Sequence, residues 1–338
     1  MVADHPLGSV YQHTTFGKVI TSTFGHIEPY YMALLDKGGR CLGGLALFLV
    51  KSWLTGNRLV SIPWACYGDP MTNSVGEFET LFKEVLELAQ RVKASYVEIK
   101  TRNTAGLLAD ANLMIPVYYN KSHFLDLTKE LSAVWNGFHR SSVKQKIRRA
   151  ERNGIRVRFA RSEQEVISFY QVFGKNRRRL GLPPQKPEYF QNIWKYMVPL
   201  GLAQFWVAHQ HNQLVGGLCT FTFKETVVLG YIATEGSLRR DGVGQYLFWS
   251  AIRRASEEGL RIVDFGKTPP YLDNLIQYKK HWGVDELEVP VFYYPRVMGV
   301  SSYENEQKLS YRVMRLFWRI VPPRLSRIAS RFFYRHTG

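Results

Sequence analysis

An apolar segment led by two glycines occurs twice in the chain and constrains its fold more than any other feature. Residues 42–51 read LGGLALFLVK, and residues 215–224 read VGGLCTFTFK. A second pair of matches follows in the same order, EIKT at 98–101 and DFGK at 264–267, with a nearly equal offset. Two ordered matches with similar offsets predict that the chain contains two copies of one fold.

Each copy has the pattern of an antiparallel meander followed by a loop, a helix and a short final strand. The meander strands are expected at 30–35, 40–51 and 58–63, and again at 204–208, 213–223 and 226–234. The helix and final strand are expected at 78–93 and 96–100 in the first copy, with a helix at 245–258 in the second. We therefore predict a mixed α/β (α+β) fold with two tandem domains. Each has a mixed, mostly antiparallel sheet flanked by helices.

The expected boundaries are 1–127 for the first domain, 128–300 for the second and 301–338 for a basic tail. The net charge of +17 is concentrated in two segments. Residues 139–161 contain nine Lys or Arg and one Glu, and residues 309–338 contain seven Arg and no acid. Such clusters favour phosphates, in RNA or in lipid headgroups, although a charge run can also be a solvated helix face.

Cysteine content and hydropathy exclude several classes of protein. Three cysteines without a Cys-x-x-Cys spacing argue against a disulfide framework or a zinc site, so we expect a reducing cytoplasm and no metal. The N-terminus lacks the pattern of a leader peptide, and the longest apolar run, 45–50, is too short to cross a bilayer. We expect a cytoplasmic protein that is neither exported nor integral.

Two further helical segments carry much of the basic charge. A helix over 132–153 would dock its apolar face and expose its Lys and Arg side chains, with Gly154 as its stop. The tail predicts two amphipathic helices around Pro322-Pro323. Their apolar faces consist of Val313, Leu316, Phe317, Ile320 and Val321, and of Leu325, Ile328, Ala329, Phe332 and Phe333. The tail is either a membrane-surface element or a hairpin packed on the second domain.

A glycine-rich loop precedes the helix at 245–258. Its sequence, Arg239-Arg240-Asp241-Gly242-Val243-Gly244, follows a strand and opens a helix. Glycines let the backbone approach an anion, and the helix N-terminus adds positive potential, which suits the pyrophosphate of coenzyme A. The order of strand, Arg-x-x-Gly-x-Gly, helix and strand resembles the core motif of the Gcn5-related N-acetyltransferase (GNAT) superfamily. We expect Arg239, Arg240, Gly242, Val243 and Gly244 to bind the cofactor.

A more specific motif lies near the end of the second copy. Asp264-Phe265-Gly266-Lys267-Thr268 is followed, after nine intervening residues, by Tyr278-Lys279-Lys280-His281-Trp282-Gly283. This resembles the Asp-Phe-Gly-Arg-Ser and Phe-Lys-x-x-Trp-Gly segments of the FemAB-type transferases, which contain two tandem GNAT-like domains. The resemblance extends over nearly the whole chain, including residues 61–68 and 176–183. The tail is similar to that of the exosortase-associated subgroup.

The resemblance implies roles for individual residues. Lys279 matches the lysine that lies beside the reacting ester and stabilises the oxyanion, and Tyr278 replaces the neighbouring phenylalanine. Asp264 either orients Lys267 or caps the next turn. Lys267 and Thr268 replace Arg-Ser, which keeps a positive charge but loses the bidentate geometry of Arg. Substrate contacts are expected from Lys267, Thr268, Tyr231, Arg177 and Tyr67, and the general base is unassigned.

The implied function is an N-acyltransferase acting on an amine of a cell-envelope acceptor, a peptidoglycan precursor or an exopolysaccharide. No cofactor is held permanently. The co-substrate is acyl-CoA or another acyl thioester, or aminoacyl-tRNA, and the lack of a long helical hairpin favours the thioester. Expected partners are an anionic membrane surface bound by the tail, the amine acceptor and tRNA, but not DNA. The alternative is a non-catalytic membrane-surface adaptor of a polysaccharide or export system.

Overall fold

The computed structural model describes residues 1–236, 241–295 and 309–336, and the chain divides into two compact units. The first unit contains residues 1–120, 288–312 and 328–338, and the second contains 121–287 and 313–327. The prediction of a mixed α/β fold with mostly antiparallel sheets and flanking helices is confirmed. The predicted boundaries at 127/128 and 300/301 divide the chain into consecutive segments, whereas each compact unit combines segments that are distant in sequence. The boundaries of the duplicated segments therefore stay a prediction.

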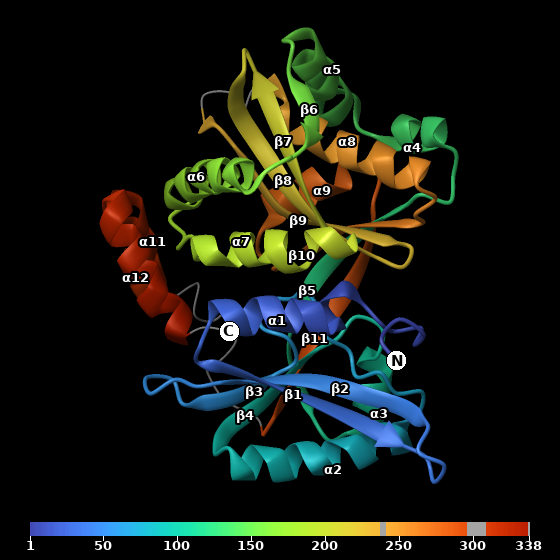
Figure 1. Ribbon diagram of the computed structural model, residues 1–338. Helices are drawn as coiled ribbons and strands as arrows, with labels where there is room; N and C mark the ends of the chain where they lie inside the picture. The colour runs from blue at the N-terminus through green and yellow to red at the C-terminus, as the bar shows by residue number, and fades with distance from the viewer. Residues whose placement is uncertain (237–240, 296–308, 337–338) are drawn as a thin grey trace. The chain divides into compact units, whose positions relative to one another are not determined.

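The strands of the first unit follow the order β1-β2-β3-β4-β11 (Figure 1). They are β1 (Ile27–Leu35), β2 (Cys41–Val50), β3 (Asn57–Val60), β4 (Ala94–Lys100) and β11 (Asp285–Tyr294). The first residues of β11, 285–287, belong to the second unit. Its helices are η1 (Val10–Gln12), α1 (Thr14–Thr23), α2 (Val75–Arg91) and α3 (Ala105–Ala111). Strand β11 comes from the far end of the sequence and pairs antiparallel with β4, with Val291 opposite Lys100.

The strands of the second unit follow the order β5-β10-β9-β8-β7-β6. They are β5 (Ile115–Asp126), β6 (Arg156–Phe159), β7 (Ala203–Gln210), β8 (Gln213–Phe223), β9 (Thr226–Thr234) and β10 (Ile262–Thr268). The helices before β7 are α4 (Leu131–Gly137), η2 (Arg140–Lys144), α5 (Gln145–Arg152), α6 (Glu163–Arg179), α7 (Pro187–Tyr196) and η3 (Val198–Leu200). Later come α8 (Val243–Glu257) and α9 (Asp273–Lys280), then the tail helices α11 (Leu309–Ile320) and α12 (Pro323–His336).

The same pairing pattern occurs in both units. Each begins with an antiparallel meander, β1-β2-β3 in the first unit and β7-β8-β9 in the second. Each then adds a strand parallel to the third strand of its meander, β4 beside β3 and β10 beside β9. The two meanders that the sequence predicts are therefore confirmed, and the shared parallel pair supports the duplication.

The repeated glycine pair marks a place of close packing in each sheet. A Cβ on Gly216 would lie 2.9 Å from Val243 of α8, and one on Gly217 would lie 2.5 Å from the ring of Phe169 on α6. Since neighbouring residues of a strand face opposite sides of the sheet, these helices pack on opposite faces, as Figure 1 shows. In the first copy, a Cβ on Gly43 would lie 2.2 Å from the carbonyl oxygen of Met71.

The single helix expected over 132–153 is wrong. Helix α4 ends at Gly137, Phe138 and His139 have extended backbone, and the chain continues through a π-helical turn, η2, into α5. The ring of Phe138 is buried between Trp249 and Trp282, at centroid distances of 5.7 and 5.1 Å. This tertiary contact outweighs the helical pattern, and the His139 ring caps the new helix by accepting from the Ser142 N–H at 3.2 Å.

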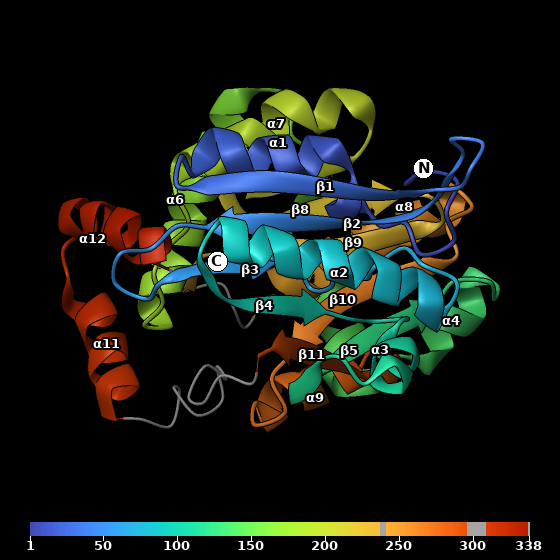
Figure 2. The ribbon, with the colours of Figure 1, turned by 90° about the horizontal axis from the view of Figure 1, so that it is seen from below.

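Both tail helices are confirmed (Figure 2). Trp318, Val321 and Tyr334 are buried, but Leu316 and Ile320 of the predicted apolar face are exposed. The other exposed apolar side chains of the tail are Phe317, Leu325 and Phe332. Within the described ranges, no helix combines the length and the hydropathy needed to span a bilayer.

Each part of the tail makes specific contacts within the unit to which it belongs. In the second unit, Arg315 of α11 donates to the Leu180 carbonyl at 3.2 Å. In the first unit, the Tyr334 ring of α12 lies against Trp64, and the His336 Nδ1 lies 2.8 Å from Ser52 Oγ. One side of the tail is thus anchored by specific contacts.

Candidate active site

Strand β10 changes its register at the centre of the Asp-Phe-Gly-Lys motif. It pairs with β5 through Asp264 opposite Phe124, and again through Lys267 opposite Ser122, with an irregularity between them. The carboxylate of Asp264 accepts the Gly266 N–H at 2.6 Å, and Gly266 has a left-handed backbone with φ of 71°. Asp264 therefore shapes this bulge from a fully buried position.

The parallel strands β9 and β10 pair only over a short stretch. Ile262, Val263 and Asp264 lie opposite residues 226–228. Beyond them, the described residues of β9 and β10 form no further pairs, although β9 continues to Thr234. Groups at the carboxyl ends of diverging parallel strands can be reached by a ligand. The candidate site lies at the carboxyl ends of β9 and β10, beside the bulge of β10.

Helix α8 begins beyond the end of β9. Its first intrahelical hydrogen bond runs from the Tyr246 N–H to the Gly242 carbonyl at 2.9 Å. The backbone N–H groups of residues 243–245 therefore have no acceptor within the helix and can bind an anion. Val243 is buried in the core, so it could offer only its backbone. Arg239 and Arg240, which the sequence assigns to the same cradle, lie outside the described residues.

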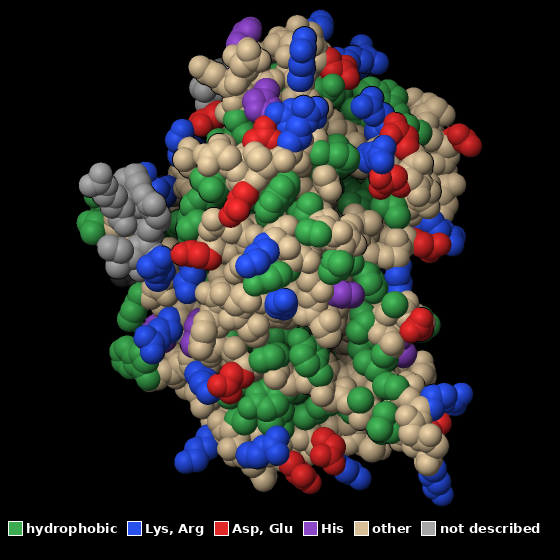
Figure 3. All heavy atoms as spheres, in the orientation of Figure 1, with side chains coloured by type: hydrophobic (Ala, Val, Ile, Leu, Met, Phe, Trp, Pro, Cys, Tyr) green, Lys and Arg blue, Asp and Glu red, His purple; other side chains and the backbone are tan. Residues whose placement is uncertain are grey.

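The backbone of α5 packs against the start of α8. Gly242 has φ of 81°, and a Cβ there would lie 2.1 Å from the Lys146 carbonyl oxygen. At Gly244 the nearest atom would be 3.6 Å away, an ordinary contact. Figure 3 shows Lys and Arg side chains gathered at the end of the second unit that carries α5 and β6. Exposed members of this group are Arg140, Arg148, Arg149, Arg152 and Arg156.

Lys279 is buried, which excludes the role of a surface charge on α9. Its side chain is only 7% exposed, and its ammonium donates to the Gly266 carbonyl at 2.7 Å and approaches the Lys267 carbonyl at 3.5 Å. A buried ammonium is stable only with such compensation. The structure therefore places the Lys279 charge at the bulge of β10.

A histidine and a glutamate that no sequence motif indicates lie in the same region. His123 of β5 is fully buried, and its Nε2 lies 3.3 Å from Glu286 Oε2. Glu286 also pairs with Lys121 at 2.7 Å and Lys280 at 3.2 Å. Burial lowers the pKa of His123 to about 4, with a further lowering from the nearby Lys279 charge.

The missed residues have no signal in the linear sequence. His123 belongs to β5, and it reaches the motif only because β5 pairs with β10, which is far away along the chain. Glu286 lies at the start of β11, just beyond the end of the Phe-Lys-type motif. No local spacing relates the two residues, so only the pairing of distant strands could have revealed them.

Tyr278 and Trp282 lie beside the cluster on the core side. Trp282 is fully buried, as expected for a core residue, and Tyr278 packs against the same core. Burial raises the pKa of Tyr278 to about 12, so its hydroxyl remains protonated at neutral pH. Tyr278 could therefore donate a hydrogen bond but not serve as a base.

The remaining candidate residues are more widely distributed. Thr268 is fully buried at the end of β10, and Lys267 of the same strand is half-buried. The Tyr231 hydroxyl of β9 donates to the Tyr189 hydroxyl at 3.1 Å. Arg177 of α6 donates to the Pro183 carbonyl at 3.1 Å, which orders the loop after that helix. Tyr67 belongs to the first unit.

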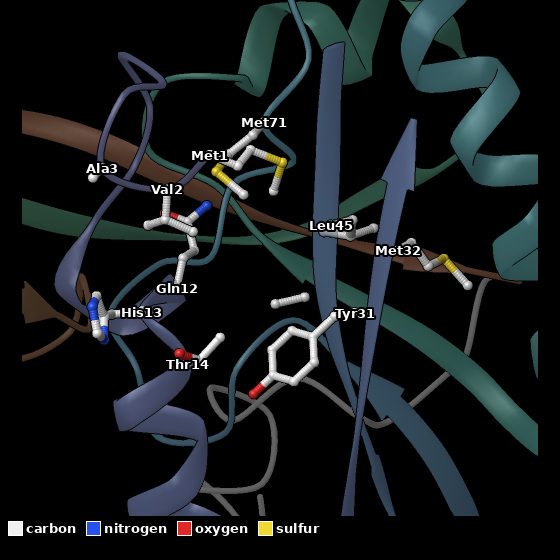
Figure 4. A pocket seen from close by; sticks show the side chains of 11 residues that line it. Met1, Val2, Ala3, Gln12, His13, Thr14, Tyr31, Met32, Leu45 and Met71 are labelled. Atoms are coloured by element: carbon white, nitrogen blue, oxygen red, sulfur yellow. The ribbon is translucent and has the colours of Figure 1, made fainter. Parts of the chain in front are cut away.

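In the first unit, Tyr67 accepts a hydrogen bond from Arg102 at 3.1 Å, and the guanidinium also lies 5.1 Å from the ring centre. Near the start of α1, this unit contains a cavity of about 350 Å³, shown in Figure 4. Its lining is mainly apolar and comprises Met1, Val2, Ala3, Gln12, His13, Thr14, Tyr31, Met32, Leu45, Ala46 and Met71. Such a lining suits an apolar group rather than an anion.

Comparison with known proteins identifies the class of the second unit. Residues 137–280 match the family model of the acetyltransferase (GNAT) domain. The match ends just after Lys279 and includes α8 and β10. The chain therefore carries the domain of an acyltransferase, and the predicted enzyme class is confirmed. Enzymes of this domain class use acyl-CoA as a co-substrate without a permanent cofactor. A search of curated protein sequences gave no match.

Solved structures share the fold over most of the chain. The crystal structure of FemX has a TM-score of 0.71 at 15% identity, with 87% of this chain and 94% of that chain covered. The C-terminal domain of a putative lysylphosphatidylglycerol synthetase from Agrobacterium fabrum has a TM-score of 0.57 at 12% identity, covering 84% and 91%. A tandem GNAT protein from the clavulanic acid biosynthesis pathway has a TM-score of 0.52 at 14% identity, covering 79% and 82%. The expected tandem GNAT-like fold is thus confirmed.

Proposed function

We propose that this protein is a FemAB-like N-acyltransferase that moves an acyl or aminoacyl group to an amine of a cell-envelope acceptor. The observation that carries the proposal is the buried Lys279 ammonium, fixed to the Gly266 carbonyl at the bulge of β10. The likeness to FemX supports the family, and the name of the lysylphosphatidylglycerol synthetase supports an envelope acceptor. The acceptor would be a peptidoglycan precursor or an exopolysaccharide.

The reaction needs little covalent chemistry from the protein. The acceptor amine attacks the acyl carbonyl, a C–N bond forms, the C–S or C–O bond to the donor breaks, and the amine proton ends on the leaving group. A fixed ammonium beside the carbonyl oxygen stabilises the negative charge that develops there. In this scheme Lys279 supplies that charge, Asp264 maintains the bulge, and Tyr278 can donate a hydrogen bond.

Two donors fit different parts of the second unit. The glycine-led start of α8 suits the pyrophosphate of an acyl-CoA. The exposed Arg side chains of α5 suit aminoacyl-tRNA. The longest described helices, α2 and α6, have 17 residues each, so this part of the chain offers no long helical hairpin for RNA. We therefore favour the thioester.

We also propose that the tail binds an anionic membrane surface, which would place the protein at the inner face of the plasma membrane. At 100° per residue, the exposed arc of α11 places Arg315 and Arg319 beside Leu316, Ile320 and Phe317. Apolar anchors bordered by Arg are typical of helices that lie in the headgroup region.

The exposed arc of α12 has the same composition. Arg331 and Arg335 are neighbours of Phe332 and Leu325 around the helix, and all four side chains are exposed. Because the buried side of the tail packs on the protein, membrane binding would leave these anchoring contacts intact. The tail's likeness to the exosortase-associated subgroup is compatible with this role and remains part of the proposal.

The transfer function is tested by donor binding and turnover. Acetyl-CoA, longer acyl-CoAs, charged tRNA and deacylated tRNA are each titrated while the melting temperature is recorded, since a bound ligand stabilises the native state. A stabilising thioester is then incubated with glucosamine, lysine or phosphatidylethanolamine vesicles, and free thiol is measured. Donor binding with Lys279-dependent thiol release is the expected result. No response to any donor would overturn the proposal and favour the adaptor function.

Membrane binding is tested by co-sedimentation with vesicles of phosphatidylcholine, with and without phosphatidylglycerol. We expect binding only with the anionic lipid, and weaker binding at high salt. The triple variant Leu316→Ser, Phe317→Ser, Ile320→Ser should lose it. Leu200→Ser is the matched control, because Leu200 is 60% exposed outside the tail. Equal binding by the triple variant and the control would disprove the membrane role.

A further inference from the structure

The turn between β2 and β3 exposes two large apolar side chains at its tip. Trp53 is 72% exposed and Leu54 is 59% exposed, and neither belongs to the core cluster of the first unit. Single exposed apolar residues are common on proteins, but adjoining ones that include a bulky aromatic ring mark a surface that binds a partner. The exposure of this tip therefore calls for an explanation outside the packing of the unit.

The end of α12 holds this turn in place. Ser52 Oγ lies 2.8 Å from His336 Nδ1, and the Thr55 hydroxyl donates to the His336 carbonyl at 3.4 Å. The buried guanidinium of Arg58 donates to the same carbonyl at 3.1 Å and to the Thr55 hydroxyl at 2.9 Å. All of these residues belong to the first unit, so the turn and the helix end form one fixed surface (Figures 1 and 2).

Aromatic contacts continue this surface onto the exposed side of α12. The His336 ring contacts the Trp53 ring at a centroid distance of 5.3 Å and the Phe332 ring at 4.8 Å. At 100° per residue, Arg335 and Arg331 follow Phe332 around the helix on the side away from His336, and all three are exposed. The turn and the helix thus form one patch, called here the turn–helix patch, which consists of Trp53, Leu54, Phe332, Arg331 and Arg335.

Charge and shape favour a lipid surface as the partner of this patch. Residues 51–58 contain Lys51 and Arg58 but no acid, and residues 309–338 contain seven Arg and no acid. Tryptophan is enriched where the headgroups of a bilayer meet its apolar core, because its ring is apolar and its N–H is polar. A protruding turn can enter such a layer directly, whereas a protein partner would have to provide a complementary hollow.

We propose that the turn–helix patch binds an anionic bilayer, with Trp53 and Leu54 in the headgroup region and Arg331 and Arg335 on the lipid phosphates. This inference rests on the membrane role proposed for the tail and extends it, because the turn lies outside the tail sequence. The first unit would then bind the membrane through its own fold as well as through α12.

The test is co-sedimentation of the full-length protein with vesicles of phosphatidylcholine and phosphatidylglycerol. The turn variant, Trp53→Ser with Leu54→Ser, should bind about tenfold more weakly or worse, because two large apolar side chains no longer leave water. Leu35→Ser is the matched control, since Leu35 is 57% exposed beside the β1–β2 turn, at the opposite end of β2. The control should bind as the wild type does. Equal binding by the turn variant and the control would overturn the inference.

Quenching of tryptophan fluorescence by brominated phosphatidylcholine reports the position of Trp53 directly. Vesicles that also contain phosphatidylglycerol should quench the wild type, and Trp53→Phe should still bind but lose most of the quenching, because an aromatic anchor remains at the tip. Trp194→Phe is the control from the second unit, where the half-buried ring packs against Phe205, and it should be quenched as the wild type is. Undiminished quenching in Trp53→Phe would show that the turn stays in water and would contradict the proposal.

The two membrane contacts can fail separately. If Leu316→Ser, Phe317→Ser, Ile320→Ser leaves vesicle binding intact but the turn variant loses it, the role of α11 fails and the turn–helix patch stands. If only the α11 variant loses binding, the patch is wrong and the role of α11 stands. A wild-type dimer in sedimentation velocity that the turn variant abolishes, without vesicle binding, would assign the patch to a second copy of the chain and overturn the inference.

Discussion

At the scale of single residues, Lys279 carries the proposed chemistry. Its ammonium is fixed by the Gly266 carbonyl, so Lys279→Ala should lower kcat about 10²- to 10³-fold, the usual effect of losing one oxyanion donor. Donor binding, measured by thermal shift, should persist, because the start of α8 is unchanged. Lys280→Ala is the control from the next position of α9. An equal loss in both variants would contradict the assignment.

His123 also predicts a pH dependence of stability. Its pKa of about 4 in the folded protein is below the ordinary value of 6.5, so the unfolded chain takes up a proton first as the pH falls. The free energy of unfolding should therefore decrease by about 2 kcal/mol between pH 7.5 and pH 5 because of this residue. Urea denaturation at both pH values measures it. His123→Gln should flatten the dependence by that amount, and an unchanged slope would contradict the prediction.

At the scale of elements, the start of α8 distinguishes two glycines that look alike in the sequence. Gly242→Ala would force a left-handed backbone and a Cβ contact of 2.1 Å with the Lys146 carbonyl, so we expect a loss of stability of about 2 kcal/mol or more. Gly244→Ala meets only ordinary contacts and should be neutral, or stabilising by up to about 1 kcal/mol. Thermal unfolding of both variants measures these changes. Equal stability of the two variants would show that Gly242 is needed only for ligand binding and not for packing against α5.

At the scale of the whole molecule, the two units depend on segments that are distant in sequence. The first unit includes β11, whose residues 291–294 pair with β4. A fragment of residues 1–127 leaves the edge of β4 without this partner, so we expect it to unfold without a cooperative transition in urea. Joining residues 285–295 to the fragment through a flexible linker should restore cooperativity. A cooperative fragment without β11 would show that the linear segment is sufficient.

The sequence alone determined the two meanders, the tandem fold, the two tail helices and the motif that contains Lys279. These features arise from side-chain periodicity and turn residues within short segments, so a short stretch of sequence is enough to predict them. The tertiary structure decided the break at Phe138, the return of β11, the burial of Lys279 on Gly266 and the outward apolar side of the tail. Each of these depends on contacts between segments far apart in the chain. The free energy of such contacts can override a local pattern, and the local sequence does not indicate them.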